Sequence, residues 1–167
     1  MRASKLLNIN ENNLIDSLTN SNILLLTLYF YTMSKSNTTE NDVLKAILQG
    51  TDPSWRAGAN LYLALYTADP GEAGTAITNE TAYTNYARQT IVKATDWTDG
   101  GASFTNAALI QFPQCGVTGA TLTHVALVTT SSGAGQILYS GALNSSLAVA
   151  NLIQPQFAIG ALTITED

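Results

Sequence analysis

From Asn60 onward, the chain is a series of short segments in which apolar side chains alternate with others, each ended by a turn signal. In the first segment, Leu61, Leu63 and Leu65 occupy every second position. A period of two places successive side chains on opposite faces of a β-strand. Residues 69–72 (DPGE) then favour a turn, because proline presets the backbone and glycine accepts a positive φ. Repeated short strands without intervening helices indicate an all-β fold.

Seven or eight such strands are expected to form an antiparallel β-sandwich of the jelly-roll-like or immunoglobulin-like kind. The segments are residues 60–66, 87–95, 103–112, 121–129, 136–143, 147–150, 155–159 and 161–165. The strand at 121–129 is expected at the centre of a sheet, because residues 125–128 are apolar on both faces. Residues 75–86 are polar and are expected to form a long loop or an irregular edge.

A short N-terminal helix is expected before the sandwich, at residues 37–50. Its apolar residues recur at helical spacing and form one stripe. They are Val43, Leu44, Ile47 and Leu48. Thr39 followed by Asp42 resembles a capping box, and Gly50 is a typical helix stop. The stripe predicts a helix that docks on another surface.

Residues 1–32 differ in composition from the rest, being rich in Asn, Leu and Ile. Their longest apolar run, residues 23–31, is short of the roughly 20 residues that span a bilayer and lacks the flanks of a signal peptide. We expect an extension outside the mature protein, which would begin at Met33. Alternatively, residues 14–31 form an apolar helix or anchor that docks on a partner. The expected division is residues 1–32 as extension, 33–58 as helix and linker, and 59–167 as sandwich.

The balance of charge limits the partners that the chain can have. It carries 7 Lys and Arg against 12 Asp and Glu, a formal net charge of −5, and only 11% of its residues are charged. An acidic chain lacks the clustered cations that bind nucleic acid without sequence preference, so no nucleic-acid partner is expected, and no membrane partner either. Thr, Ser and Asn make up 48 of the 167 residues. This composition favours a structural or binding protein.

One histidine and one cysteine leave little room for nucleophilic chemistry. His124 lies in a predicted strand with apolar neighbours, where a histidine is more often structural than catalytic. Cys115 has no second cysteine for an intrachain disulfide and is expected to be a buried thiol. A hydrolase that uses His124 is the least favoured of the functions considered.

Two pairs of carboxylates could ligate a cation or transfer protons, but both lie in predicted turns. They are Asp69 with Glu72 and Asp96 with Asp99. Asp commonly bonds a backbone amide two residues on in turns, and calcium takes six to eight oxygen ligands. The glycines near them lack the context of a phosphate-binding loop. These glycines are Gly71, Gly74, Gly100 and Gly101. We therefore expect no catalytic, cofactor-binding or metal-ligating residue.

Aromatic side chains offer the alternative of a carbohydrate-binding platform, because tyrosine presents a flat apolar face with a polar tip. The candidates are Tyr62, Tyr66, Tyr83, Tyr86 and Trp97. The favoured interpretation is that half of them belong to the core and the rest to an interface between copies. Arg88, surrounded by predicted strands, is expected to pair with Glu80 or Asp96 and to fix strand register.

Several segments together resemble a family of small tailed-bacteriophage proteins commonly labelled phage tail fibre proteins. They are NLYLALYTADPGEAGT (60–75), YTNYARQ (83–89), FTNAALIQFP (104–113), THVALVT (123–129), ILYSGAL (137–143) and FAIGALTITED (157–167). The opening LYLALYTADP followed by YARQ is the most specific pair, and the resemblance covers about residues 43–167.

The resemblance implies a non-enzymatic virion structural protein, made in the host cytoplasm, and brings no catalytic motif. Its expected partners are further copies of itself and other virion proteins, in the capsid or the tail. Capsid decoration and a tail or fibre component both remain open. The alternative function is a host-recognition module of a phage fibre that binds a surface glycan.

Overall fold

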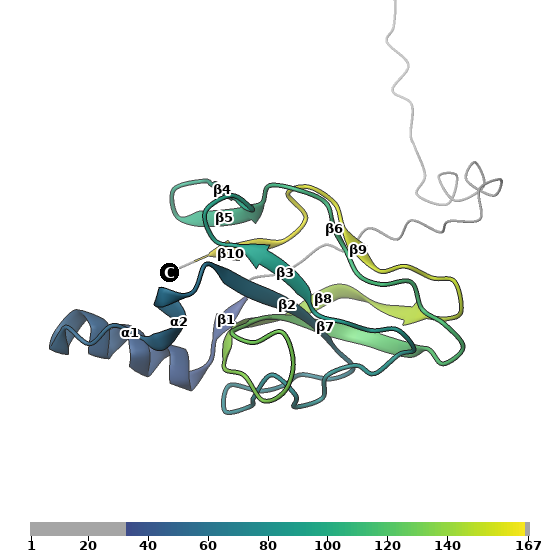
Figure 1. The fold of residues 1–167 in the computed structure, drawn as a ribbon, viewed down its shortest axis with the longest axis horizontal. Coiled ribbons are helices and arrows are strands. Elements are labelled where there is room, and N and C mark those ends of the chain that lie inside the picture. The colour runs from purple at the N-terminus through teal and green to yellow at the C-terminus, as the bar shows by residue number, and fades with distance from the viewer. Residues whose placement is uncertain (1–32, 166–167) are drawn as a thin grey trace, which may run out of the picture.

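The computed structural model describes residues 33–165. The expected extension at residues 1–32, and the alternative docking segment at 14–31, lie outside the described residues. Within them, the fold is the predicted all-β, antiparallel sandwich preceded by a short helix. Figure 1 shows a large sheet with smaller sheets lying over one of its faces.

The large sheet has five antiparallel strands in the order β1-β8-β7-β2-β3. Their bounds are β1 Ser34–Lys35, β8 Ile137–Val149, β7 Ala120–Val128, β2 Asn60–Tyr66 and β3 Gln89–Val92. The two central strands, β2 and β7, pair from Tyr62↔Val128 to Tyr66↔His124. The last four residues of each strand are buried on both faces, as the continuous apolar run in β7 predicted.

The second layer consists of a three-stranded sheet, in the order β10-β5-β4, and a two-stranded sheet of β6 and β9. The bounds are β10 Thr163–Thr165, β5 Ser103–Asn106, β4 Trp97–Asp99, β6 Ile110–Gln111 and β9 Gln156–Phe157. The core lies between the layers, with Leu63, Leu65 and Leu122 from the large sheet and Phe112 and Phe157 from the smaller one.

Helix α1 (Asn37–Gln49) begins at a different cap than the sequence indicated but ends where it was predicted to end. Its N-cap is Ser36, whose Oγ accepts from the Thr39 amide at 3.3 Å. The predicted capping box at Thr39 and Asp42 is therefore wrong by one turn. The stop is as predicted, because Gly50 adopts φ 65°. A second helix, α2 (Ser54–Ala57), follows in the predicted linker.

The predicted strand at 103–112 divides into β5 and β6 after Asn106, the buried last residue of β5. Its Nδ2 donates to the Ala108 and Ala158 carbonyls at 2.7 and 2.8 Å, and its Oδ1 accepts from the Leu162 amide at 2.8 Å. These bonds turn the chain out of the sheet.

The predicted strands at 136–143 and 147–150 are instead one strand, β8. Its register against β7 jumps from His124↔Ala142 to Leu122↔Leu147, so a bulge carries the exposed Asn144-Ser145-Ser146 stretch without ending the strand.

Candidate functional site

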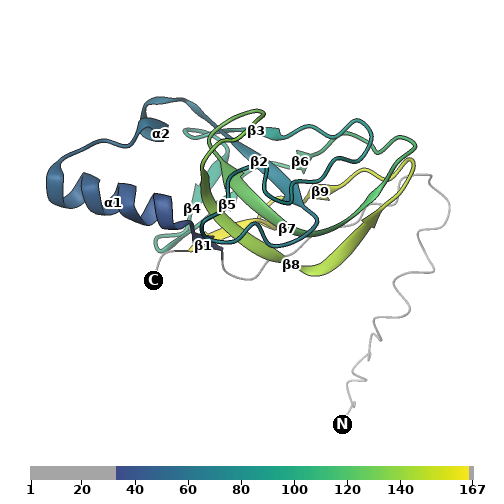
Figure 2. The same ribbon diagram turned by 90° about the horizontal axis from the view of Figure 1, so that it is seen from below.

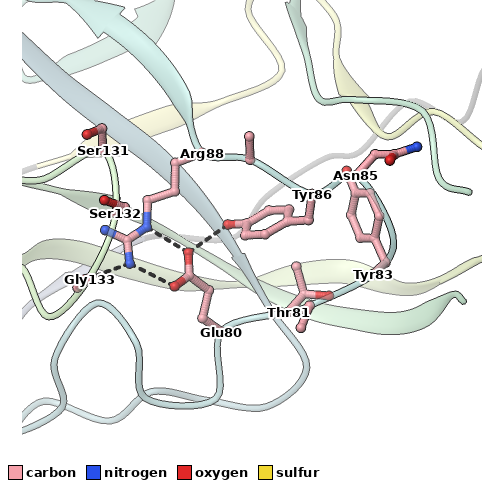
Figure 3. Close-up of a pocket in the computed structure, with 11 residues that line it drawn as sticks. Glu80, Thr81, Tyr83, Asn85, Tyr86, Arg88, Ser131, Ser132 and Gly133 are labelled. Atoms are coloured by element: carbon pink, nitrogen blue, oxygen red, sulfur yellow. Dashed lines mark hydrogen bonds and ion pairs between the residues drawn. The ribbon is translucent and has the colours of Figure 1, made fainter.

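A pocket of about 460 Å³ contains several of the residues that the sequence singled out (Figure 3). Glu80, Tyr86 and Arg88 point toward one another inside it, and Ser131 and Ser132 lie on a facing loop. We call Arg88, Glu80 and the groups that bond to them the Arg88 centre.

The Arg88 centre is a buried two-pronged ion pair. Arg88 Nε donates to Glu80 Oε1 at 2.6 Å, and its Nη2 donates to Glu80 Oε2 at 2.7 Å. The two side chains are only 2% and 14% exposed. Hydrogen bonding to Glu80 raises the pKa of Arg88 above its ordinary value, so the guanidinium keeps its charge. The expected partnership with Glu80 is confirmed. Asp96, the other candidate, instead accepts from the Val92 amide at 2.8 Å.

The remaining donors of Arg88 bond to the loop between β7 and β8 and to a second point on the β2–β3 connection that carries Glu80. Nη1 donates to the carbonyl and Oγ1 of Thr130 at 2.8 and 3.0 Å. Nη2 donates to the carbonyls of Gly133 and Ala76 at 2.9 and 3.3 Å. A guanidinium has five N–H donors, and all of them have partners here. Arg88 therefore joins loops more than it fixes strand register, and it leaves no donor for a bound molecule.

The tyrosines do not form the exposed platform that the carbohydrate-binding alternative requires. Tyr66 is fully buried and donates to the Ala76 carbonyl at 3.0 Å. Tyr83 is 2% exposed and donates to the Pro113 carbonyl at 2.9 Å. Burial raises the pKa of both phenols above the ordinary range. The favoured interpretation, that part of the set is core, is correct for these two rings.

Tyr86 belongs to the Arg88 centre. Its hydroxyl donates to Glu80 Oε1 at 2.9 Å and accepts from the Leu65 amide at 3.0 Å. Its ring stacks on Phe112, with centroids 6.3 Å apart and planes 9° apart. Desolvation by burial raises the pKa of this phenol as well. The ring therefore links the pocket to the core.

The remaining candidates for chemistry have structural surroundings. His124 lies on β7 opposite Tyr66, and its Nδ1 shares a hydrogen bond with Thr123 Oγ1 at 2.9 Å. Cys115 is buried. Asp69 and Asp99 each accept from a glycine amide two residues on, at 2.8 and 2.7 Å, as predicted for turns. Within residues 33–165, no three His, Cys, Asp or Glu side chains gather as a metal site would require.

A second hollow, of about 490 Å³, is almost entirely apolar. It lies where α2 and the ends of β2, β7 and β8 meet the small sheet. We call it the tryptophan cleft, because both tryptophans of the chain line it. Its lining includes Trp55, Leu61, Trp97, Phe104, Tyr139 and Ile164. Neither the cleft nor the place of Trp55 in its wall was predicted from the sequence.

Trp55 is held in place at both ends. Its Nε1 donates to Asp42 Oδ2 at 3.0 Å, and Lys93 Nζ donates to its carbonyl and to that of Gly58. The ring packs against the main core while remaining half-buried. The cleft wall on this side is therefore rigidly positioned.

Helix α1 leaves its apolar stripe uncovered by the other described residues. Leu44, Ile47 and Leu48 are 55%, 72% and 76% exposed, and we call them the α1 apolar face. The helix is fixed instead by polar groups at its base, where Ser36 Oγ and Thr39 Oγ1 both donate to the Ile137 carbonyl. Within residues 33–165 nothing covers this face, so the expectation that the helix docks on another surface stays a prediction.

The remaining observations concern membrane-spanning helices and the comparison with known proteins. Among residues 33–165, no helix is both long and apolar enough to cross a membrane. A comparison with curated proteins finds no match. The model of a family described as Podophage GP4 fiber I protein gp80 matches residues 34–165, which confirms the resemblance to phage tail fibre proteins. The chain therefore belongs to the Podophage GP4 fiber I protein gp80 family, whose description is that of a bacteriophage fibre protein.

Proposed function

We propose that this chain is a non-enzymatic structural subunit of a bacteriophage fibre, which associates with further copies of itself and with other virion proteins. The observation that carries this function is the match of residues 34–165 to a family of bacteriophage fibre proteins. The Arg88 centre agrees with a structural role, because its charged and polar groups, the best candidates for chemistry among the described residues, bond to one another and to two loops. A site built in this way stabilises a shape and has no donor on Arg88 left to polarise a substrate.

The surface supports the same proposal. Few residues are charged, while large apolar side chains are exposed on α1 and around the tryptophan cleft. Exposed apolar patches usually mark contacts between proteins. A subunit present in many copies buries such surfaces when it assembles, and closed symmetric assemblies are the usual result.

Electron cryo-microscopy of the phage particle tests the proposal. We expect density for this chain in a fibre of the tail region, and peptides from it in the mass spectrum of purified particles. Density on the head lattice would contradict the fibre role and favour capsid decoration. Absence of the chain from purified particles would contradict both.

The glycan-binding and hydrolase alternatives have separate tests. Tyr66 and Tyr83 are buried, so the proposal assigns no glycan to them, and we expect no binding of the full chain to a host glycan array. For His124, we expect that His124→Ala yields a folded protein and phage of normal infectivity. Loss of infectivity with a normally folded variant would contradict the non-enzymatic proposal.

A further inference from the structure

We infer that the α1 apolar face of one copy seats in the tryptophan cleft of the next copy, forming a head-to-tail contact. The inference rests on the proposed self-association and names the two surfaces that would form it. It commits to a second copy of this chain as the occupant of the cleft.

The α1 apolar face forms a ridge along one side of the helix, a shape that packs into a groove. Leu44, Ile47 and Leu48 are spaced by three and four residues, so their side chains line one side of the helix. Figure 1 shows α1 projecting from the end of the sandwich, and Figure 2 shows the same from below. Large aliphatic side chains exposed by 55% to 76% are costly in water, which favours a partner that covers them.

The tryptophan cleft has the matching chemistry. Trp55 and Trp97 form part of its wall and Phe104, 44% exposed, lies open to solvent. Its volume of about 490 Å³ lies within the roughly 300–1,000 Å³ of pockets that hold ligands. Aromatic side chains in an apolar hollow are typical of the centres of protein interfaces.

The arrangement of α1 argues against the helix filling the cleft of its own chain. Asp42, near the base of α1, accepts from the Trp55 indole and from Gln136 Nε2, both at 3.0 Å. These bonds, together with those of Ser36 and Thr39 to Ile137, hold α1 beside the cleft with its apolar face turned to solvent. The helix and the cleft thus lie in the same part of the molecule but remain unpaired within the described chain.

Exposed charges of both signs lie beside the α1 apolar face, because Glu40 precedes Leu44 by four residues, and one of them is opposite in sign to a charge beside the cleft. Lys45 lies on α1 between Leu44 and Leu48, and it is exposed. Asp99, also exposed, ends β4 beside the cleft residues Gly101 and Ala102. Where each copy offers its helix to one neighbour and its cleft to another, the contact is heterologous, and it closes into a ring or continues as a filament. Either form suits a fibre.

The protein carries its own reporter for this contact. Both tryptophans of the chain line the cleft, so intrinsic fluorescence reports when the cleft is covered. We expect tryptophan emission of the full chain to shift to shorter wavelength as the protein concentration is raised, with the mass of the species followed by sedimentation over the same series. The shift should occur over the same concentrations at which the mass rises above that of one chain.

Two variants separate the two halves of the contact. Leu48→Asp places a charge on the ridge, and Ala102→Glu places one at the cleft without altering the core. Each should weaken self-association by roughly tenfold or more. Leu48→Asp removes the burial of a leucine side chain from the contact. Ala102→Glu adds the cost of removing a carboxylate from water when the contact forms. Val117→Asp, at a position 89% exposed and in neither surface, is the matched control and should associate normally. Circular dichroism and urea unfolding establish that all three are folded.

Mixing the two variants gives the decisive result. Leu48→Asp retains a good cleft and Ala102→Glu retains a good helix, so an equimolar mixture should form a complex of two chains and no larger species. If instead Ala102→Glu associates like the unaltered chain while Leu48→Asp does not, the helices pack on each other and the head-to-tail contact is wrong. Tryptophan emission that is already shifted in the monomer, and independent of concentration, means that the chain covers its own cleft and likewise overturns the inference.

The failure of this contact can be told from failure of the proposed function. If both variants remain oligomeric, the chain assembles through other surfaces and only the contact is wrong. If the unaltered chain stays monomeric at every concentration and is absent from the particle, the proposed structural function fails with it.

Discussion

The single guanidinium of Arg88 bonds to Glu80, Thr130 and Gly133, so its removal should lower the stability of the fold strongly. In Arg88→Met the guanidinium is lost while the Glu80 carboxylate, 14% exposed, stays largely buried. Loss of one partner from a buried pair costs about 3–5 kcal/mol, so we expect a decrease of that size in the free energy of unfolding measured in urea.

Arg56→Met is the matched control. Arg56 also pairs with a carboxylate, Asp52, but the two side chains are 68% and 72% exposed. Exposed pairs contribute about 0–1 kcal/mol, so little change is expected. Equal effects of the two substitutions would show that the Arg88 centre does not hold the loops together.

Three buried phenols should make the fold sensitive to alkali. Burial raises the pKa of Tyr66, Tyr83 and Tyr86 in the folded chain, whereas in the unfolded chain a tyrosine ionises near pH 10. The unfolded chain then releases protons that the folded chain retains. The contribution to stability is therefore constant below about pH 10 and lost as the pH rises above it.

Ultraviolet absorbance of phenolate, measured beside urea unfolding, checks the alkaline prediction. We expect the phenolate signal of these residues to appear together with loss of the fold. The prediction fails if all tyrosines ionise near pH 10 while the protein remains folded.

At the scale of elements, the junction of β7 and β8 depends on a residue without a side chain. A Cβ built on Gly119 would lie 1.9 Å from the Val149 carbonyl oxygen and 2.9 Å from its carbon. These are backbone atoms next to the Ala120↔Val149 pair, so they cannot move without opening the sheet. Gly119→Ala should lower the free energy of unfolding by about 1–3 kcal/mol or more.

Gly58→Ala provides the comparison, since the nearest atom to its Cβ would be 3.9 Å away. Its stability should be unchanged or slightly increased. A Gly119→Ala protein as stable as Gly58→Ala, measured by thermal unfolding, would contradict the close approach of the two strands.

The sequence predicted well those strands whose own residues carry the full hydrophobic pattern of a strand. Strand β2 has a period of two along its full length, and the C-terminal part of β7 is apolar on both faces, so their bounds agree with the structure to within a residue or so. Strand β4 was missed because its three residues, Trp97–Asp99, include one of the two aspartates that indicated a turn. Its pairing with β5 depends on a partner outside the local pattern.

The Arg88 centre, the tryptophan cleft and the α1 apolar face also depend on contacts between residues far apart in the sequence, so each was only partly predicted or missed. Glu80 and Asp96 each lie eight residues from Arg88, so sequence separation alone did not choose between them. The tryptophan cleft had no local signal, because Trp55 and Trp97 meet only when α2 packs beside the small sheet. The α1 stripe is exposed because Ser36 and Thr39 fix the helix to the Ile137 carbonyl. The spacing of the apolar residues in α1 gives no sign of these bonds.

At the scale of the whole molecule, the low charge predicts how assembly responds to salt. Only 11% of the residues are charged, and the surfaces proposed to meet are apolar. A roughly tenfold rise in NaCl, to about 0.5 M, screens charge interactions beyond a few Å. We expect the association constant from sedimentation to stay within about threefold, and sulfate to increase it. Dissociation by NaCl would indicate that ion pairs, rather than apolar contacts, hold the copies together.

The pairing of β2 with β7 also sets an order of events during synthesis. Tyr62 lies opposite Val128, and Tyr66 lies opposite His124, so β2 leaves the ribosome about 60 residues before its central partner exists. At about 5–20 residues per second, this delay is about 3–12 s. During that time Leu63 and Leu65, fully buried in the finished fold, have no β7 to cover them. A nascent chain with such a delay exposes an apolar, unpaired strand to other nascent chains on the same mRNA, where it can aggregate. The rate of translation should therefore influence how much folded subunit is produced.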